Sequence, residues 1–376
     1  MKILFFNNII TPTNTPLFNG LKKHFENQGI DFKVIFTSAT ESNRSYDTSK
    51  EEAKFLFDYM VLDNKKLNIN SNKDNHFFHL NFDIPKLLDQ EKPDVIIHGG
   101  WAWLSAWTSL WWCKKNNAKF ILWSGSTVYE NSWRRTLTKP IVKYLIKKSD
   151  GFLSYGTRAT EYLISLGASK EKIYPLYNTV DIDFFLQNAE KLQPQKEEIK
   201  KKYGIKTKYV LLFVGQLIKR KGVYEILNGF TEFQKIHPEI SLVFAGSWQE
   251  QKNMEKIIQE QGIKNVFFPW FFQNDAISGF YTMADIFTLP SEEEVWGLVI
   301  NEAMCFGLPV ITAYQVGAWV DLVQEWKNGY IMKENSAREF EKWLEYIFEK
   351  GLVERNNSVE TIGKFRVKDI VKGVKF

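Results

Sequence analysis

Ile-Phe-Thr-Leu-Pro-Ser-Glu-Glu-Glu-Val-Trp-Gly-Leu-Val-Ile-Asn-Glu-Ala-Met, residues 286–304, joins two apolar runs through an acidic loop. The composition of 286–289 is typical of a buried strand, and Val299–Phe306 is a nearly apolar helix beginning near Gly297 or Leu298. The first N–H groups of a helix have no acceptor within it, and they lie at the positive end of the helix dipole. The stretch therefore predicts a strand, a loop and a helix whose start suits a diphosphate, which Gly297 lets approach closely.

The same alternation of strand and helix extends through the second half of the chain. It predicts a doubly wound parallel sheet, because consecutive parallel strands need helical crossovers. The predicted strands are Tyr209–Val214, Ser241–Ala245, Val266–Phe268, Ile286–Leu289 and Val310–Thr312, and the helices are Val223–His237, Gln251–Gln261, Ile277–Met283 and Val299–Phe306.

A second set of alternating runs occupies the first half. Strands are predicted at Lys2–Phe6, Phe32–Phe36, Val95–His98, Phe120–Trp123 and Gly151–Tyr155, and helices at Leu17–Gln28, Phe82–Gln90, Trp101–Lys115, Leu137–Lys148 and Thr157–Leu166. Residues 38–75 are polar and predict a long irregular excursion. We expect an α/β fold of two Rossmann-like doubly wound domains facing a central cleft: 1–185, a linker region 186–206, and 207–360, with a helix near 361–376 packing back on the first domain.

Composition narrows the class of protein. A chain of 376 residues fits two domains, and 44% hydrophobic with 25% charged residues is a globular composition. The net charge of +5 is too small to indicate a nucleic-acid partner. Cys113 and Cys305 lie far apart in apolar runs, which argues against a disulfide framework or a zinc site and favours a reducing cytoplasm. No apolar run reaches the roughly 20 residues of a membrane span.

Two carboxylates stand out. Glu302 is the one charged residue of Val299–Phe306, and an ionised carboxylate among apolar residues needs hydrogen-bond donors, which sugar hydroxyls could supply. Glu294 lies eight positions earlier, in the loop. The alternatives are a complement to the helix dipole for Glu294 and an internal salt bridge for Glu302.

A second candidate loop follows the strand Tyr209–Val214. It contains Gly215, Gln216 and Lys221 before the next helix. Lys221 could neutralise phosphate, although a Lys-Arg-Lys turn is also compatible with plain solvation.

Taken together, these motifs resemble glycosyltransferase family 4, the retaining enzymes of the GT-B fold. The family pattern Pro-Ser-x-x-Glu-Gly-Phe-Gly-x-x-x-x-Glu-Ala matches here through Pro290, Ser291, Glu294, Gly297, Glu302 and Ala303. Further matches are Gly307-Leu308-Pro309-Val310-Ile311, Gly317, Asn328-Gly329, Tyr281-x-x-Ala284-Asp285 and Asn178-Thr179-Val180-Asp181-x-x-Phe184.

The resemblance implies a role for each residue on the donor side. Glu294 would hold the donor sugar, Gly297, Leu298 and Val299 would offer amides to the diphosphate, and Glu302 would hold the ribose. Lys221 would stabilise the leaving phosphate, so Glu294 and Lys221 are the two expected catalytic residues. Gly215 and Gln216, in the same loop as Lys221, are also expected to bind the donor. Gln216 stands where the family has Arg, so its role is in question. The nucleotide diphosphate-sugar is a substrate, and neither a cofactor nor a metal ion is expected.

The first domain would carry the acceptor, a glycan or a lipid-linked molecule. Asn14 is a candidate because it lies in the loop after the first strand, which here lacks the family's Gly. Ser124 and Ser126 are candidates because they follow the strand after which many members carry a His. His98, at the end of another strand, is the nearest substitute for that His, although a lone His there is more often structural. The stretch 133–148 has six basic residues and no acidic one. It predicts either an ordinary surface helix or a contact with the inner face of a membrane.

Rival interpretations keep the fold and change the chemistry. They are a nucleotide-sugar epimerase, a phosphorylase and a sugar-nucleotide binding protein without activity. Intact Glu294, Glu302 and Lys221 argue against the last of these.

Overall fold

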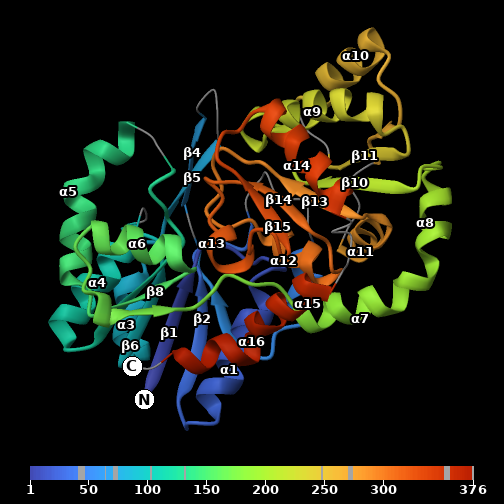
Figure 1. The fold of residues 1–376 in the computed structure, drawn as a ribbon. Helices are drawn as coiled ribbons and strands as arrows, with labels where there is room; N and C mark the ends of the chain where they lie inside the picture. The colour runs from blue at the N-terminus through green and yellow to red at the C-terminus, as the bar shows by residue number, and fades with distance from the viewer. Residues whose placement is uncertain are drawn as a thin grey trace. The chain divides into compact units, whose positions relative to one another are not determined.

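The computed structural model describes residues 1–40, 47–63, 65–70, 75–101, 104–130, 133–246, 249–269, 274–350 and 356–374. Contacts divide the chain into unit 1, Met1–Val180 with Val367–Phe376, and unit 2, Asp181–Arg366. Each unit has its own parallel sheet with helices packed on it (Figure 1). The predicted class, α/β with two doubly wound sheets, is confirmed.

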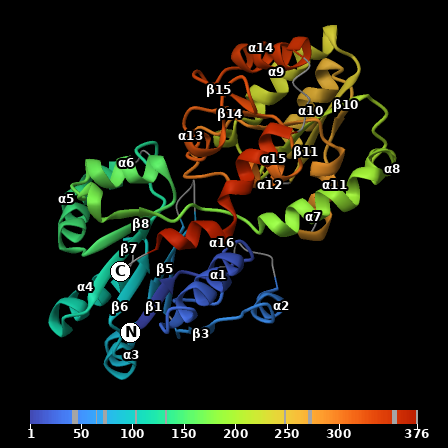
Figure 2. The same ribbon diagram turned by 60° about the horizontal axis from the view of Figure 1, so that its bottom comes forward.

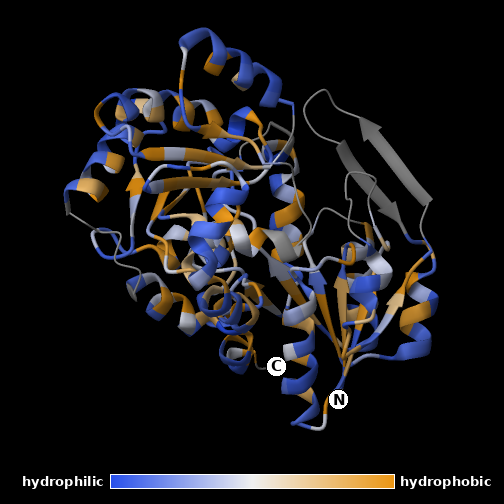
Figure 3. Cartoon of the chain, turned by 90° about the vertical axis from the view of Figure 1, so that its right-hand side faces the viewer, coloured by the Kyte–Doolittle hydropathy of each residue, from blue (hydrophilic) through white to orange (hydrophobic). Residues whose placement is uncertain are grey.

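Unit 1 is built on a seven-stranded parallel sheet in the order β3-β2-β1-β6-β7-β8-β9. Its inner strands are short apolar runs, because a parallel sheet covered on both faces has no polar face. In Figure 3 the strands are coloured mainly as hydrophobic. The strands are β1 Lys2–Asn7, β2 Asp31–Phe36, β3 Asp58–Val61, β6 Val95–Gly99, β7 Lys119–Ser124, β8 Gly151–Ser154 and β9 Ile173–Pro175.

Part of 38–75 lies outside the described residues (41–46, 64 and 71–74), and for the rest the prediction of an irregular excursion is wrong. This region contains α2 Thr48–Glu52, the strand β3 and the strand β4 Lys65–Asn70, which pairs antiparallel with β5 Asn75–Leu80. β3 joins β2 at the sheet edge and is only partly covered. An edge strand has one neighbour and keeps polar residues, so its sequence lacks the apolar signal of inner strands.

Helices bury both faces of this sheet. One core includes α1 Thr15–Glu26 together with Ile370, Val371 and Val374. Ile370 is the last residue of α16 Val367–Ile370, and Val371 and Val374 follow it. Gly20 of α1 lies directly against Val367, and α1 and α16 run side by side (Figures 1 and 2). The other core lies under the remaining helices, which are α3 Ile84–Glu91, α4 Leu104–Asn116, α5 Trp133–Lys148 and α6 Thr157–Ser165.

Unit 2 has a six-stranded parallel sheet in the order β12-β11-β10-β13-β14-β15. The chain winds outward from β10 through β11 to β12, then returns to the other side of β10 with β13. The winding thus reverses between β10 and β13, and ligands of such sheets bind beyond the carboxyl ends of the strands at this point. The strands are β10 Tyr209–Val214, β11 Ile240–Ala245, β12 Val266–Phe267, β13 Ile286–Leu289, β14 Val310–Ala313 and β15 Gly329–Met332.

The helices α9 to α12 of unit 2 follow the four predicted crossovers, whereas α13, α14 and α15 were not predicted. The bounds of these helices are α9 Val223–Ile236, α10 Gln251–Gln261, α11 Asn274–Met283, α12 Leu298–Cys305, α13 Trp319–Leu322, α14 Ala337–Lys350 and α15 Asn356–Ile362. Short 3-10 turns lie at Lys170–Lys172, Gln193–Gln195, Lys219–Lys221, Gly363–Phe365 and Val371–Gly373. Among the helices that the structure describes, none combines the length and apolarity needed to cross a bilayer.

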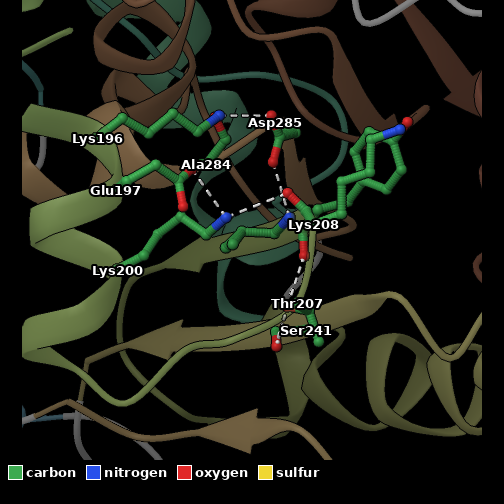
Figure 4. Close-up of polar contacts among 10 residues, drawn as sticks. Lys196, Glu197, Lys200, Thr207, Lys208, Ser241, Ala284 and Asp285 are labelled. Atoms are coloured by element: carbon green, nitrogen blue, oxygen red, sulfur yellow. Dashed lines mark hydrogen bonds and ion pairs between the residues drawn. The ribbon is translucent and has the colours of Figure 1, made fainter. Parts of the chain in front are cut away.

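Residues 186–206, expected as a linker region, carry most of α7 Ile182–Leu192 and all of α8 Lys196–Lys202, and both helices pack on α11. A polar network holds α8 at the amino edge of the sheet (Figure 4). Lys196 Nζ lies 2.6 Å from Asp285 Oδ1, and Asp285 Oδ2 accepts a 2.9 Å hydrogen bond from Val210 N. The buried Lys200 donates to the carbonyl oxygen of Lys208 at 3.3 Å. The polar composition of this segment therefore reflects buried ion pairs as well as solvation.

Asp285 is buried and joins α8, β10 and β13. We expect Asp285→Ala to lower the free energy of unfolding of unit 2 by ~3 kcal/mol, because it removes the carboxylate partner of Lys196 and leaves the Val210 amide without its acceptor. Urea denaturation measures this loss. The control is Glu232→Ala, which removes the exposed Lys235 pair and should cost less than ~0.5 kcal/mol. Equal losses in the two variants would contradict the anchoring role of Asp285.

Candidate functional site

The predicted catalytic pair meets where the winding of unit 2 reverses. Lys221 ends the 3-10 turn after β10, Glu294 lies in the loop after β13, and Lys221 Nζ forms an ion pair with Glu294 Oε2. The two side chains are only 15% and 19% exposed. Of the other residues predicted after β10, Gly215 donates its N–H to the Ala245 oxygen at 3.2 Å, and Gln216 is exposed.

Backbone contacts hold these two loops together. The Arg220 carbonyl oxygen accepts hydrogen bonds from Glu292 N at 2.8 Å and from Ser291 Oγ at 3.1 Å. Gly222, at φ +72°, lies so close to the other loop that a Cβ would be 2.2 Å from the Pro290 oxygen. Only glycine fits there, because both the left-handed backbone and the missing side chain are needed. The ion pair is therefore positioned by the backbone beneath it.

The helix α12 begins at the same loop. Gly297, at φ +98°, is its N-cap, and no side chain caps the helix start. Leu298 and Val299 are the first helical residues and are only partly buried, so the first N–H groups remain available to an anion. The loop is fixed from behind by the buried hydrogen bond from Trp296 Nε1 to Asn301 Oδ1, 2.9 Å long.

Glu302 lies one turn further along α12. It accepts a 2.6 Å hydrogen bond from Tyr281 Oη of α11. Burial raises the pKa of Glu302 to about 7, and the Tyr281 hydrogen bond offsets part of that effect. Within the described ranges no Lys or Arg forms an ion pair with Glu302, so the alternative of an internal salt bridge is not observed there. A half-buried carboxylate with one phenol donor retains acceptor capacity for hydroxyl groups.

Comparison with known proteins identifies the family. The sequence model of "Glycosyl transferases group 1" matches residues 195–364, and that of "Glycosyltransferase Family 4" matches residues 19–184. The chain belongs to glycosyltransferase family 4. The first match covers the whole of the candidate site, from Lys221 to Glu302.

Individual relatives are distant. Spore coat protein SA of Bacillus subtilis is 32% identical over 176 residues, 44% of this chain and 46% of that protein. Sulfoquinovosyl transferase SQD2 of Arabidopsis thaliana is 29% identical over 218 residues, 56% of this chain and 40% of that protein. Each alignment thus spans less than half of the relative's length. The crystal structure of Anabaena HepE in complex with UDP has a TM-score of 0.74 at 17% identity, covering 99% of this chain and 98% of that chain.

Of the four acceptor-side candidates in unit 1, His98 is the most deeply buried. His98 ends in the core: it is 1% exposed, its Nδ1 contacts the Gly100 oxygen at 3.1 Å and its Nε2 contacts Ser105 Oγ at 3.0 Å. Burial lowers the pKa of His98 to about 4, so the ring is neutral. These contacts give His98 a structural role, because both ring nitrogens have partners and solvent is excluded.

The other three candidates follow strands of unit 1. Asn14 is the N-cap of α1, without a side-chain capping bond, in the loop after β1. Ser124, which is buried, accepts from Ser126 N at 3.2 Å. Ser126 Oγ in turn accepts from Arg135 Nη2 at 3.2 Å, and Arg135 also pairs with Glu130. Ser124 and Ser126 are thus engaged in organising the loop before α5.

The sequence alone does not indicate several contacts of this candidate site. Tyr281 was part of the matched motif, yet its hydrogen bond to Glu302, 21 positions away, has no local signal. The sequence predicts only a Lys-Arg-Lys turn around Arg220, whereas the backbone of Arg220 and Gly222 joins the two loops. The spacing of residues along the sequence cannot reveal the contacts between the two loops, because they depend on β10 and β13 being neighbours in the sheet.

Gly222 offers a test of the junction between the loops. Gly222→Ala should lower the free energy of unfolding by ~3 kcal/mol, through backbone strain and the clash with Pro290. Gly262→Ala is the matched control, because Gly262 also has positive φ, +64°, but a Cβ there meets nothing within 4 Å. It should cost about 1 kcal/mol. If urea denaturation gives the two variants the same stability, the tight junction is contradicted.

Glu302 predicts a pH dependence of stability. Its pKa is about 7 in the folded chain against an ordinary value of 4.5. Between these pH values the unfolded chain releases the proton while the folded chain keeps it, so unfolding becomes more favourable as pH rises. We therefore expect wild-type stability to fall relative to Glu302→Gln from about pH 4.5 to 7 and to level off above. Urea denaturation of both proteins across this range is the measurement, and a difference that is flat or rises with pH would refute it.

Proposed function

We propose that this chain is a retaining, metal-independent hexosyltransferase. It moves a sugar from a nucleotide diphosphate-sugar to a hydroxyl of a glycan or lipid-linked acceptor, in the synthesis of a bacterial surface polysaccharide or glycoconjugate. The observation that carries the proposal is the Lys221–Glu294 ion pair beside the uncapped start of α12, at the reversal of the sheet. Family membership and the likeness to a structure with bound UDP support it.

The diphosphate would lie at the start of α12. The amides of Leu298 and Val299 would donate to its oxygens, and Lys221 would turn from Glu294 toward the phosphate that leaves. Glu294, released from the ion pair, would accept hydrogen bonds from the donor sugar. Glu302 would accept from the ribose hydroxyls, which favours its ionised form over the neutral one.

The reaction we propose takes place on one face of the sugar. The bond between the anomeric carbon and the phosphate oxygen breaks, the acceptor oxygen bonds to the same carbon, and the acceptor proton passes to the leaving phosphate. Configuration is retained, and no side-chain base is required. Lys221 and the α12 amides supply positive charge where the leaving phosphate develops negative charge. This charge is the reason we expect no dependence on a metal ion.

The acceptor and its location form the second part of the proposal. The relative from B. subtilis is named as a spore coat protein, which supports a role in surface structures. We place the enzyme in the cytoplasm, with peripheral contact to the inner face of the membrane through 133–148. The basic charge of that helix supports this placement.

A thermal-shift screen tests the donor site. We expect at least one nucleoside diphosphate or its sugar to raise the unfolding temperature, because it binds the folded chain alone. Glu302→Ala should weaken that ligand about tenfold through the lost ribose contacts. Lys221→Ala should lower the transfer rate about a hundredfold. Lys219→Ala, an exposed lysine of the same turn, is the control and should change neither.

Three outcomes would count against the proposal. Absence of any thermal shift across the panel contradicts the donor site. Complete turnover of the nucleotide-sugar without acceptor favours an epimerase, and binding without transfer to any acceptor favours a protein without activity. For a donor and acceptor that react, a metal chelator should leave the transfer rate unchanged. The anomeric configuration of the product, measured by NMR, should equal that of the donor sugar.

A further inference from the structure

Helix α5 carries two apolar stripes, and only one of them is buried. Val142, Leu145 and Ile146 pack in the core of unit 1. Leu137, Ile141 and Tyr144 lie at the spacing of one helix face but are 67%, 56% and 43% exposed. A surface helix ordinarily turns polar residues to solvent, so a second apolar stripe needs an explanation.

Helix α4 continues the same surface. Ala106, Leu110 and Cys113 are buried, whereas Leu104 and Trp111, seven positions apart, are 49% and 55% exposed. The helices lie next to each other in Figures 1 and 2, and their aromatic rings connect them. Trp107 stacks against Tyr144 with ring centroids 6.4 Å apart, and Trp111 also lies 6.4 Å from Tyr144. We call the exposed side chains Leu104, Trp111, Leu137, Ile141 and Tyr144 the α4/α5 face.

The two helices that carry this face are basic. Neither helix contains an acidic residue. Among the described residues, Lys139, Lys143 and Lys147 have no ion pair with a carboxylate, and Lys148 Nζ lies 5.8 Å from the Tyr144 ring. The neighbouring acids are engaged elsewhere, Asp150 with Lys114 at 2.8 Å and Glu130 with Arg135 at 2.6 Å. The face therefore combines exposed apolar groups with uncompensated cations.

We propose that the α4/α5 face docks on an anionic lipid bilayer, with its five apolar side chains in the interface and the lysines at the phosphate level. Aromatic and aliphatic groups flanked by lysines match the two layers of such a surface, acyl chains below and phosphates above. A nucleic acid would account for the lysines and leave Leu137 and Ile141 without purpose. The inference rests on the proposed function for its consequence: it brings unit 1 to a lipid-linked acceptor.

Vesicle sedimentation of the full chain tests this docking. We expect binding to vesicles containing about one third phosphatidylglycerol, little binding to phosphatidylcholine alone, and release by salt. The double variant Leu137→Gln/Ile141→Gln should weaken binding about tenfold, as should Trp111→Gln. Ile236→Gln is the matched control, because Ile236 is 66% exposed on α9 of unit 2; it should bind as the wild type does.

The outcomes separate the docking surface from the transferase activity of the proposed function. Failure of the wild type to bind anionic vesicles at low salt overturns the docking surface. Normal binding by the apolar variants, with loss in Lys139→Gln/Lys143→Gln, also overturns it, since the contact would then be with charge alone. Unfolding temperatures equal to that of the wild type show that the variants fold. If the double variant Leu137→Gln/Ile141→Gln fails to fold, vesicle binding by Trp111→Gln decides the test. Vesicle binding by a wild type that binds no nucleotide would leave the docking in place and reject the transferase.

Discussion

Two loops that follow neighbouring strands of unit 2 are locked together through their backbones, and the rest of the candidate site depends on that lock. Gly222 lies against Pro290, and the Arg220 carbonyl accepts from Ser291 and Glu292. These contacts fix where Lys221 and Glu294 meet. They exist because the sheet reverses its winding between β10 and β13, which makes two loops of distant sequence adjacent.

The charges of Lys221 and Glu294 balance each other in this region. Lys221 and Glu294 neutralise each other while largely shielded from solvent, and Glu302 is partly protonated near neutral pH because burial raises its pKa. A diphosphate bound as we propose would have to compete with Glu294 for Lys221. Affinity is lost in that competition, but the lysine is already held at the start of α12. Such an arrangement favours ligands that engage both Lys221 and the carboxylates over simple anions.

Much of this was predictable from the sequence, and the exceptions have physical causes. The inner strands of both sheets follow from apolar runs, and the motif resemblance singles out Lys221 and Glu294. The ion pair between these two residues was not predicted. The edge strands β3, β9 and β15 were not predicted, because each has only three or four residues and such a run is too short to show a strand pattern. The composition of residues 186–206 predicts a solvated linker, because it cannot show that Lys196 pairs with the buried Asp285 or that the buried Lys200 donates to the Lys208 carbonyl oxygen. His98 looked available at a strand end, yet its ring lies between Phe6 and Phe120.

Residues 367–376 give the chain an unusual path. The polypeptide leaves unit 1 at residue 180, builds unit 2, and comes back at residue 367 to complete the core beside α1. Two covalent crossings therefore connect the units instead of one. A proteolytic nick at either crossing would leave two fragments held together by the packed contacts of residues 367–374 within unit 1. A gene fragment encoding residues 1–180 would lack Ile370, Val371 and Val374, so its product would expose the apolar side of α1 to water and aggregate.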